Sequence, residues 1–163
     1  MGAWQQIGET FQEEFSDVPD AAIVTRITIR LTMAAVLGGV LGYERERMGK
    51  AAGLRTHMLV ALGAALFVLI PLQSGVTQTD LTRVLQGLVA GVGFLGAGAI
   101  IKGNGSEQEV KGLTTAAGIW LTAAIGVAAG TGREVTAVLS TAIALAILTV
   151  VPRVARFLDR REG

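Results

Sequence analysis

The chain has 163 residues, of which 51% are hydrophobic and only 17% charged, whereas soluble domains carry about 25% charged residues. Its net charge of +1 gives no basis for nucleic-acid binding, and the absence of cysteine removes disulfides and thiolate metal sites. The single histidine, His57, excludes a two-histidine metal motif, and no serine lies in a Gly-x-Ser-x-Gly elbow. We therefore expect no metal site, no cofactor and no enzyme.

The first segment, residues 1–20, predicts a short amphipathic helix that stops near Pro19. Its apolar residues recur every three or four positions, with the acidic residues mostly opposite: Trp4, Ile7, Phe11, Phe15 and Val18. The segment lacks the basic start of a signal peptide. Two interpretations remain open: an interfacial helix on the outer leaflet, or a packing helix that caps the rest of the molecule.

Five uncharged runs occupy the segment 21–152, namely 31–43, 56–79, 84–101, 112–132 and 135–152. The last four are 18 to 24 residues long, and a membrane-spanning helix needs about 20 apolar residues. The first run reaches that length if its helix extends back toward Ala21 through Arg26 and Arg30. The predicted fold class is therefore all-α, a polytopic membrane protein with five transmembrane helices, followed by a basic tail, 153–163.

The distribution of Lys and Arg predicts the topology. Ten of them follow the first helix, the third helix and the fifth helix, whereas only Arg83 and Arg133 lie in the connections on the opposite side. A turn at Asn104-Gly105 joins the third and fourth helices. Because positive residues gather on the cytoplasmic side, we expect the N-terminus outside and the C-terminus in the cytoplasm.

Glycines mark the expected helix-packing positions. Three pairs have the small-xxx-small spacing that lets helices approach closely, at 38/42, 87/91 and 126/130. They predict a tight bundle or a helix-mediated homo-oligomer. The string Gly-Val-Gly-Phe-Leu-Gly at 91–96 matches a dinucleotide fingerprint, but it lies inside an apolar helix without the required strand. The expected packing set is Gly38, Gly42, Gly87, Gly91, Gly93, Gly96, Gly98, Gly126 and Gly130.

Polar residues at the helix ends form the hypothetical functional core. Arg30 lies deepest in the first helix, where an arginine costs about 2.5 to 3.5 kcal/mol, so we expect it to face the interior and pair with a carboxylate or a ligand anion. Glu44 lies roughly 21 Å further along that helix, so it is expected to meet Arg55, while Asp80 is the nearest partner for Arg30. The alternative is that these residues only fix topology and stability. The full set is Arg30, Glu44, Arg45, Arg55, Thr56, Asp80, Arg83, Gln86, Thr114 and Thr115.

The chain resembles the MgtC/SapB family of bacterial inner-membrane proteins over about residues 28–132. The matching stretches keep order and spacing: Leu-Gly-Tyr-Glu-Arg-Glu at 41–46, Ala-Gly-Leu-Arg-Thr-His at 52–57, Arg83-x-x-Gln86-Gly87, Gly-Val-Gly-Phe-Leu-Gly-Ala-Gly-Ala-Ile at 91–100, and Gly-Leu-Thr-Thr-Ala-Ala at 112–117 with Trp120. The resemblance implies a five-helix membrane domain with the N-terminus outside. Many relatives add a cytosolic ACT-like domain; since this sequence ends at Gly163, we expect the short form without it.

The resemblance also implies a function. It links the chain to magnesium-limited growth, to intracellular survival in some pathogens, and to regulation of membrane energetics through the proton-translocating ATP synthase. We therefore expect a non-enzymatic protein of the bacterial inner membrane that acts in the lipid bilayer through contacts with another membrane protein. The alternative is a small-solute or ion transporter or channel with a polar path near Arg30. A cation carrier commonly keeps a carboxylate deep in the membrane, and the acidic residues here lie at helix ends.

Overall fold

A computed structural model describes residues 2–14, 16, 20–101 and 111–159 of the chain. These residues form six helices and no strand: α1 (Ala3–Glu14), α2 (Ala21–Arg47), α3 (Leu54–Gln73), α4 (Gln78–Ile101), α5 (Leu113–Gly130) and α6 (Glu134–Asp159). The predicted all-α fold class is confirmed. Within the described residues, α2 to α6 are five helices long and apolar enough to cross a membrane, as expected. The expected features at Phe15, Val18, Pro19, Lys102, Asn104-Gly105, Arg160 and Arg161 lie outside the described residues.

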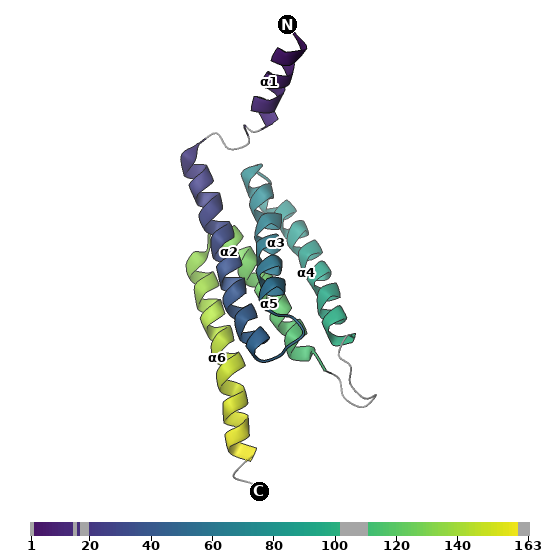
Figure 1. Cartoon of the computed structure of the whole chain (residues 1–163), viewed down its shortest axis with the longest axis vertical. Helices are drawn as coiled ribbons and strands as arrows, with labels where there is room; N and C mark the ends of the chain where they lie inside the picture. The colour runs from purple at the N-terminus through teal and green to yellow at the C-terminus, as the bar shows by residue number, and fades with distance from the viewer. Residues whose placement is uncertain (1, 15, 17–19, 102–110, 160–163) are drawn as a thin grey trace.

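Helix α1 is amphipathic and lies beyond the end of the bundle (Figure 1). None of its residues is buried, and the side chains of Trp4, Ile7 and Phe11 are exposed. The structure therefore does not place α1 as a cap packed on the other helices. Helix α2 begins after Asp20, whose side chain accepts a hydrogen bond from the amide of Ala22, so the first membrane helix does extend back through both arginines.

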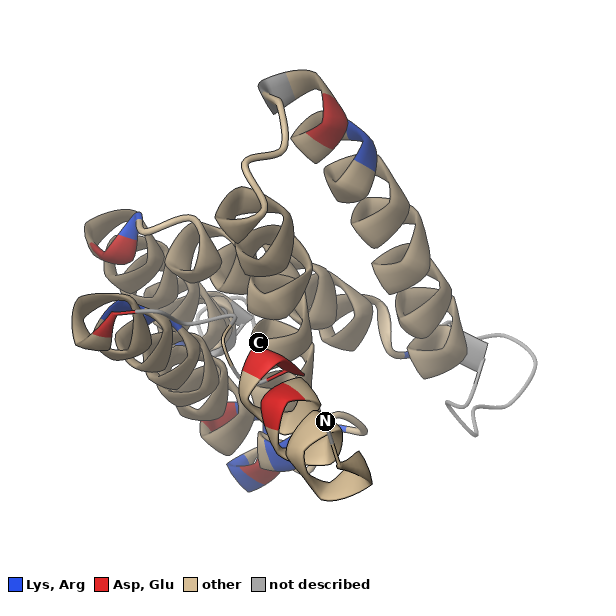
Figure 2. Cartoon of the chain, turned by 90° about the horizontal axis from the view of Figure 1, so that it is seen from above, with Lys and Arg blue, Asp and Glu red and all other residues tan. Residues whose placement is uncertain are grey.

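The five long helices run up and down, with α5 at the centre (Figure 1). Helix α5 contacts each of the other four, and α3 packs against α2, α4 and α5. One end of the bundle carries the turn from α2 to α3, the start of α5 and the end of α6; we call it the Arg45 end. The other, the Arg30 end, carries the start of α2 and the α3–α4 and α5–α6 turns. Charged residues lie near the helix ends and leave long uncharged stretches between them (Figure 2).

Glycines on α2 and α5 bring both helices close to α3. A Cβ at Gly38 would lie 2.6 Å from the carbonyl oxygen of His57, and one at Gly42 would lie 2.7 Å from Cα of Leu54. From α5, a Cβ at Gly126 would meet the carbonyl oxygen of Ala61. Two of the three small-xxx-small pairs, 38/42 and 126/130, therefore pack inside a single chain.

The centre of the bundle is an apolar core. Ala34, Ala61, Ala65 and Ala129 are fully buried between α2, α3 and α5, and Ile125 packs with them. These small side chains continue the close helix approach that the glycines begin. The core lies between Arg30 and Arg45, which are separated by about 22 Å along α2 at 1.5 Å per residue.

The connection between α3 and α4 is short, and α4 begins before the uncharged run 84–101 that predicted it. Helix α4 already begins at Gln78, because Thr77 caps it: the Thr77 hydroxyl accepts from the amide of Asp80 and donates to the Asp80 carboxylate at 2.6 Å. Asp80 and Arg83 therefore lie in the first turns of α4 and not in a loop.

Candidate functional site

A buried polar cluster lies at the Arg45 end and comprises Glu44, Arg45, His57 and Thr115. The inward face of α2 carries Gly38, Leu41, Gly42 and Arg45, which recur at helical spacing and are all buried. The glycines that admit α3 therefore also turn Arg45 inward. Only 4% of Arg45 is exposed, although arginine is almost never fully buried unless it is paired.

Arg45 has partners on two sides. Its Nη2 donates to the hydroxyl of Thr115 on α5 at 3.4 Å, and its Nη1 lies 3.9 Å from Oε2 of Glu44. Both bonding distances are long, and the Nε of Arg45 and the Oε2 of Glu44 are buried without a hydrogen-bond partner in the described part of the chain. The cluster is therefore buried and charged, with few direct hydrogen bonds among the described residues, and this makes it the candidate site.

His57 is the most buried member of the cluster, with no exposed surface. Its Nδ1 lies 3.0 Å from the carbonyl oxygen of Gly53, and because a carbonyl only accepts, Nδ1 carries the proton. In the neutral ring the Nε2 atom then offers a lone pair, and among the described residues nothing donates to it. Arg45 and Glu44 are the charged groups that act electrostatically on this ring.

A cavity of about 150 Å³ adjoins His57 between α2, α3, α5 and α6. Its walls are mainly apolar, and Thr114 adds a hydroxyl. Gly118 leaves room beside the ring, since a Cβ there would lie 3.6 Å from Nε2 of His57. The buried hydroxyl of Thr122, which has no hydrogen-bond partner among the described residues, follows Gly118 by one helical turn on the same helix.

Glu46 holds the turn between α2 and α3 in place. Its Oε2 accepts from the amide of Leu54 at 2.8 Å, at the N-terminus of α3. A carboxylate there satisfies a free N–H and complements the helix dipole. Gly53 makes room for it, because a Cβ at that position would lie 2.5 Å from the same carboxylate oxygen.

Arg30 is half-buried at the opposite end and contacts the α5–α6 turn. Its Nη1 donates to the carbonyl oxygen of Gly130 at 3.3 Å, at the negative end of the α5 dipole. The expected pairing with Asp80 is wrong, because Asp80 bonds Thr77 and forms an ion pair with Arg83 at 3.7 Å. That ion pair is exposed, with 77% of the Arg83 side chain accessible, so it contributes little stability.

The structure separates the other predicted site residues. Arg55 and Thr56 are exposed, and the expected Glu44–Arg55 pair is wrong because Glu44 lies beside Arg45 instead. Gln86 is exposed on α4, a helix that contributes no residue to the cluster. Of the predicted set, the structure brings together Glu44, Arg45 and Thr115, with Thr114 on the adjoining cavity. Sequence reasoning missed His57, Thr122 and Glu46; the one available signal was a lone histidine at the start of a long apolar run.

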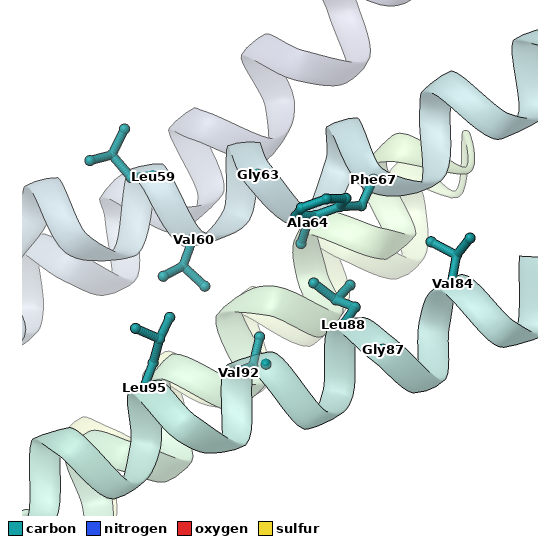
Figure 3. Close-up of a pocket in the computed structure, with 11 residues that line it drawn as sticks. Leu59, Val60, Gly63, Ala64, Phe67, Val84, Gly87, Leu88, Val92 and Leu95 are labelled. Carbon is teal, nitrogen blue, oxygen red and sulfur yellow. The ribbon is translucent and has the colours of Figure 1, made fainter.

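An apolar groove of about 560 Å³ lies between α3 and α4 (Figure 3). Val60 and Ala64 on α3 and Leu88 and Val92 on α4 point into it. The glycines along α4 have no neighbour there: a Cβ at Gly87, Gly91, Gly93 or Gly98 would find nothing within 4 Å, and only Gly96 faces another helix, at Ala116. The third small-xxx-small pair, 87/91, is thus open.

The sequence pattern of the MgtC family matches residues 31–157, which include this cluster, the groove and the whole apolar core. The chain belongs to the MgtC family. With its five apolar helices, this MgtC-family chain is a multi-pass membrane protein.

Relatives in the MgtC family agree with that assignment. SrpB of Synechococcus elongatus is 41% identical over 147 residues, covering 84% of this chain and 81% of SrpB. YhiD of Escherichia coli K12, whose name provisionally assigns it magnesium transport, is 42% identical over 75% of this chain and 59% of its own length. MgtC of Brucella abortus is 42% identical over 82% of this chain. The chain spans little more than half of YhiD and MgtC, at 59% and 56%. No solved structure matches it.

Proposed function

We propose that this chain is a non-enzymatic protein of the bacterial inner membrane that supports adaptation to low magnesium and regulates membrane energetics through helix contacts with another membrane protein. The magnesium link rests on the family and on the name of YhiD, to which the chain is similar. The proposed orientation has the Arg30 end outside and the Arg45 end in the cytoplasm, in keeping with the excess of Lys and Arg at the latter.

The observation that carries the proposal is the open glycine face of α4. In lipid, helices associate through close packing at small residues and not through hydrophobic burial. Such packing occurs inside the chain at the pairs 38/42 and 126/130, where α3 lies directly against each glycine. At 87/91 the same spacing is present without a neighbour, and the α3–α4 groove lies beside it. We infer that a helix from another molecule packs on this face, and the partners to test are a second copy of the chain and the ATP synthase.

The alternative, a transporter with a polar path near Arg30, requires polar groups between the two ends. Between the two ends, the buried side chains among the described residues are apolar except for the hydroxyls of Thr122 and Thr141, and none of them is charged. This supports the regulatory proposal. The Arg45 cluster then serves as the cytoplasmic polar site of the regulator, with Glu44, Arg45 and His57 as its central residues.

Complementation of growth in low magnesium tests the proposal. The host is a strain whose growth under magnesium limitation depends on the protein. Gly91→Leu fills the open face and is expected to abolish rescue at normal membrane levels of the protein. Gly93→Leu is the matched control: it makes the same substitution on the same helix about 200° around the axis, also where nothing lies within 4 Å. Full rescue by Gly91→Leu contradicts the proposal.

A further inference from the structure

A pocket of about 420 Å³ opens at the Arg30 end, between the start of α2 and the end of α3. Arg26 and Arg30 line it from α2, one helical turn apart, and Gln73 lines it from α3. Its remaining walls are apolar side chains of the same two helices, including Leu69 and Leu72. The pocket thus combines two guanidinium groups and one amide with an apolar lining.

The two arginines lack an acidic partner within the described residues. The ion pairs there are Arg45 with Glu44 and Arg83 with Asp80. The other described carboxylates at this end of the bundle are those of Asp20 and Glu134. Neither belongs to these two ion pairs, and Asp20 caps α2. Two like charges one turn apart on a helix are destabilising, and an anion between them would remove that repulsion.

Arg30 is held in position by the α5–α6 turn. Gly132 has φ +78°, and a Cβ there would overlap Nη2 of Arg30, so this turn has room for the guanidinium only because residue 132 is glycine. Of the five N–H donors of Arg30, one bonds the carbonyl oxygen of Gly130, and Nε has no partner in the described structure. The group is therefore fixed and still has donors to offer.

We propose that this pocket binds a phosphate-bearing anion, with the phosphate between Arg26 and Arg30 and the amide of Gln73 as a neutral donor. Guanidinium groups suit this ligand because their planar forks match phosphate oxygens and keep their charge. The phosphate comes from one of two sources: the headgroup of an anionic phospholipid, whose apolar part would lie along Leu69 and Leu72, or inorganic phosphate in solution.

Binding measurements on the purified full chain in mild detergent distinguish the sources. One arm titrates phosphatidylglycerol and counts bound lipid by native mass spectrometry, with zwitterionic phosphatidylcholine for comparison. The other arm titrates inorganic phosphate by calorimetry. Binding of phosphatidylglycerol alone assigns the lipid headgroup, and binding of inorganic phosphate assigns the free anion; either result supports the pocket when it depends on both arginines.

The variants Arg26→Gln and Arg30→Gln are each expected to weaken binding about tenfold or more, the loss typical of one hydrogen bond to a charged group. Arg133→Gln is the matched control, since Arg133 is an exposed arginine at the same end that does not line the pocket. Arg26 is exposed and takes part in neither ion pair of the described residues, so Arg26→Gln keeps the test valid if Arg30→Gln fails to fold. The proposal is overturned if neither probe binds, if phosphatidylcholine binds as tightly as phosphatidylglycerol, or if Arg133→Gln weakens binding as much as the pocket variants.

Discussion

Replacing Gly126 by alanine adds one methyl group where α5 meets the backbone of α3. The new Cβ would meet the carbonyl oxygen of Ala61 and lie 2.9 Å from both its carbonyl carbon and its Cα. These are backbone atoms inside a helix, so they cannot rotate away as a side chain does. The two helices must separate, and the neighbouring contacts at Gly130 and Ala65 must loosen with them.

The magnitude follows from two opposing terms. Overpacking a filled site costs about 1 to 3 kcal/mol, and a rigid backbone obstacle favours the upper part of that range. Alanine is a better helix former than glycine by about 1 kcal/mol, which offsets part of the loss. We expect Gly126→Ala to destabilise the protein by about 1 to 2 kcal/mol, whereas Gly87→Ala, which meets nothing within 4 Å, keeps only the propensity gain.

Thermal unfolding of both variants in the same detergent measures the difference. For a chain of this size, 1 kcal/mol corresponds to roughly 2 to 4 °C in Tm. The Tm of Gly126→Ala should fall below that of the wild type, and that of Gly87→Ala should equal or exceed it. Equal Tm values for the two variants would refute the assignment of one glycine face to the interior and the other to the surface.

Three further results are expected. Glu46→Ala removes the cap of α3 and should lower stability by about 1 kcal/mol, measured by thermal unfolding; an unchanged Tm would show that the cap is dispensable. Thr115→Val leaves Nη2 of Arg45 without its acceptor and should cost about 1 to 3 kcal/mol, whereas Thr114→Val, at an exposed neighbour, should cost much less; similar losses would contradict the Arg45 contact. A reporter fused after Gly163 should be active as a cytoplasmic fusion, and activity only in the periplasm would reverse the proposed topology.

The number and approximate position of the membrane helices could be predicted from the sequence, because uncharged runs report directly on membrane crossing. The start of α4 could not, since Thr77 caps the helix at Gln78, before the uncharged run 84–101 begins. Capping depends on local hydrogen bonds that a count of apolar residues does not contain.

The pairing of charges could be predicted only in part. The buried arginine at the end of α2 is Arg45, and adjacent Glu44 points about 100° away around the helix. The spacing of Gly38, Gly42 and Arg45 already places them on one face, so the inward position of Arg45 follows from the sequence once α3 is known to pack there. The partner of Arg30 is a backbone carbonyl, and no side-chain pattern indicates it.

The glycine pairs show where sequence reasoning ends. The pairs 126/130 and 87/91 have the same spacing in apolar helices. Helix α3 packs against the first pair, whereas a Cβ at either glycine of the second would meet nothing within 4 Å. Which helix faces a motif is decided by the arrangement of all five helices, and a single motif carries no information about that arrangement.

Photo-crosslinking in the native membrane tests the central claim most directly. A photoreactive residue at Leu95 lies on the α3–α4 groove one turn from Gly91, and one at Ile143 on the exposed side of α6 serves as control. We expect Leu95 to yield a cross-link to another membrane protein or to a second copy, identified by mass spectrometry and lost in the Gly91→Leu background, while Ile143 yields only lipid adducts. Lipid adducts alone from both positions would contradict the claim that α4 presents a protein-binding face.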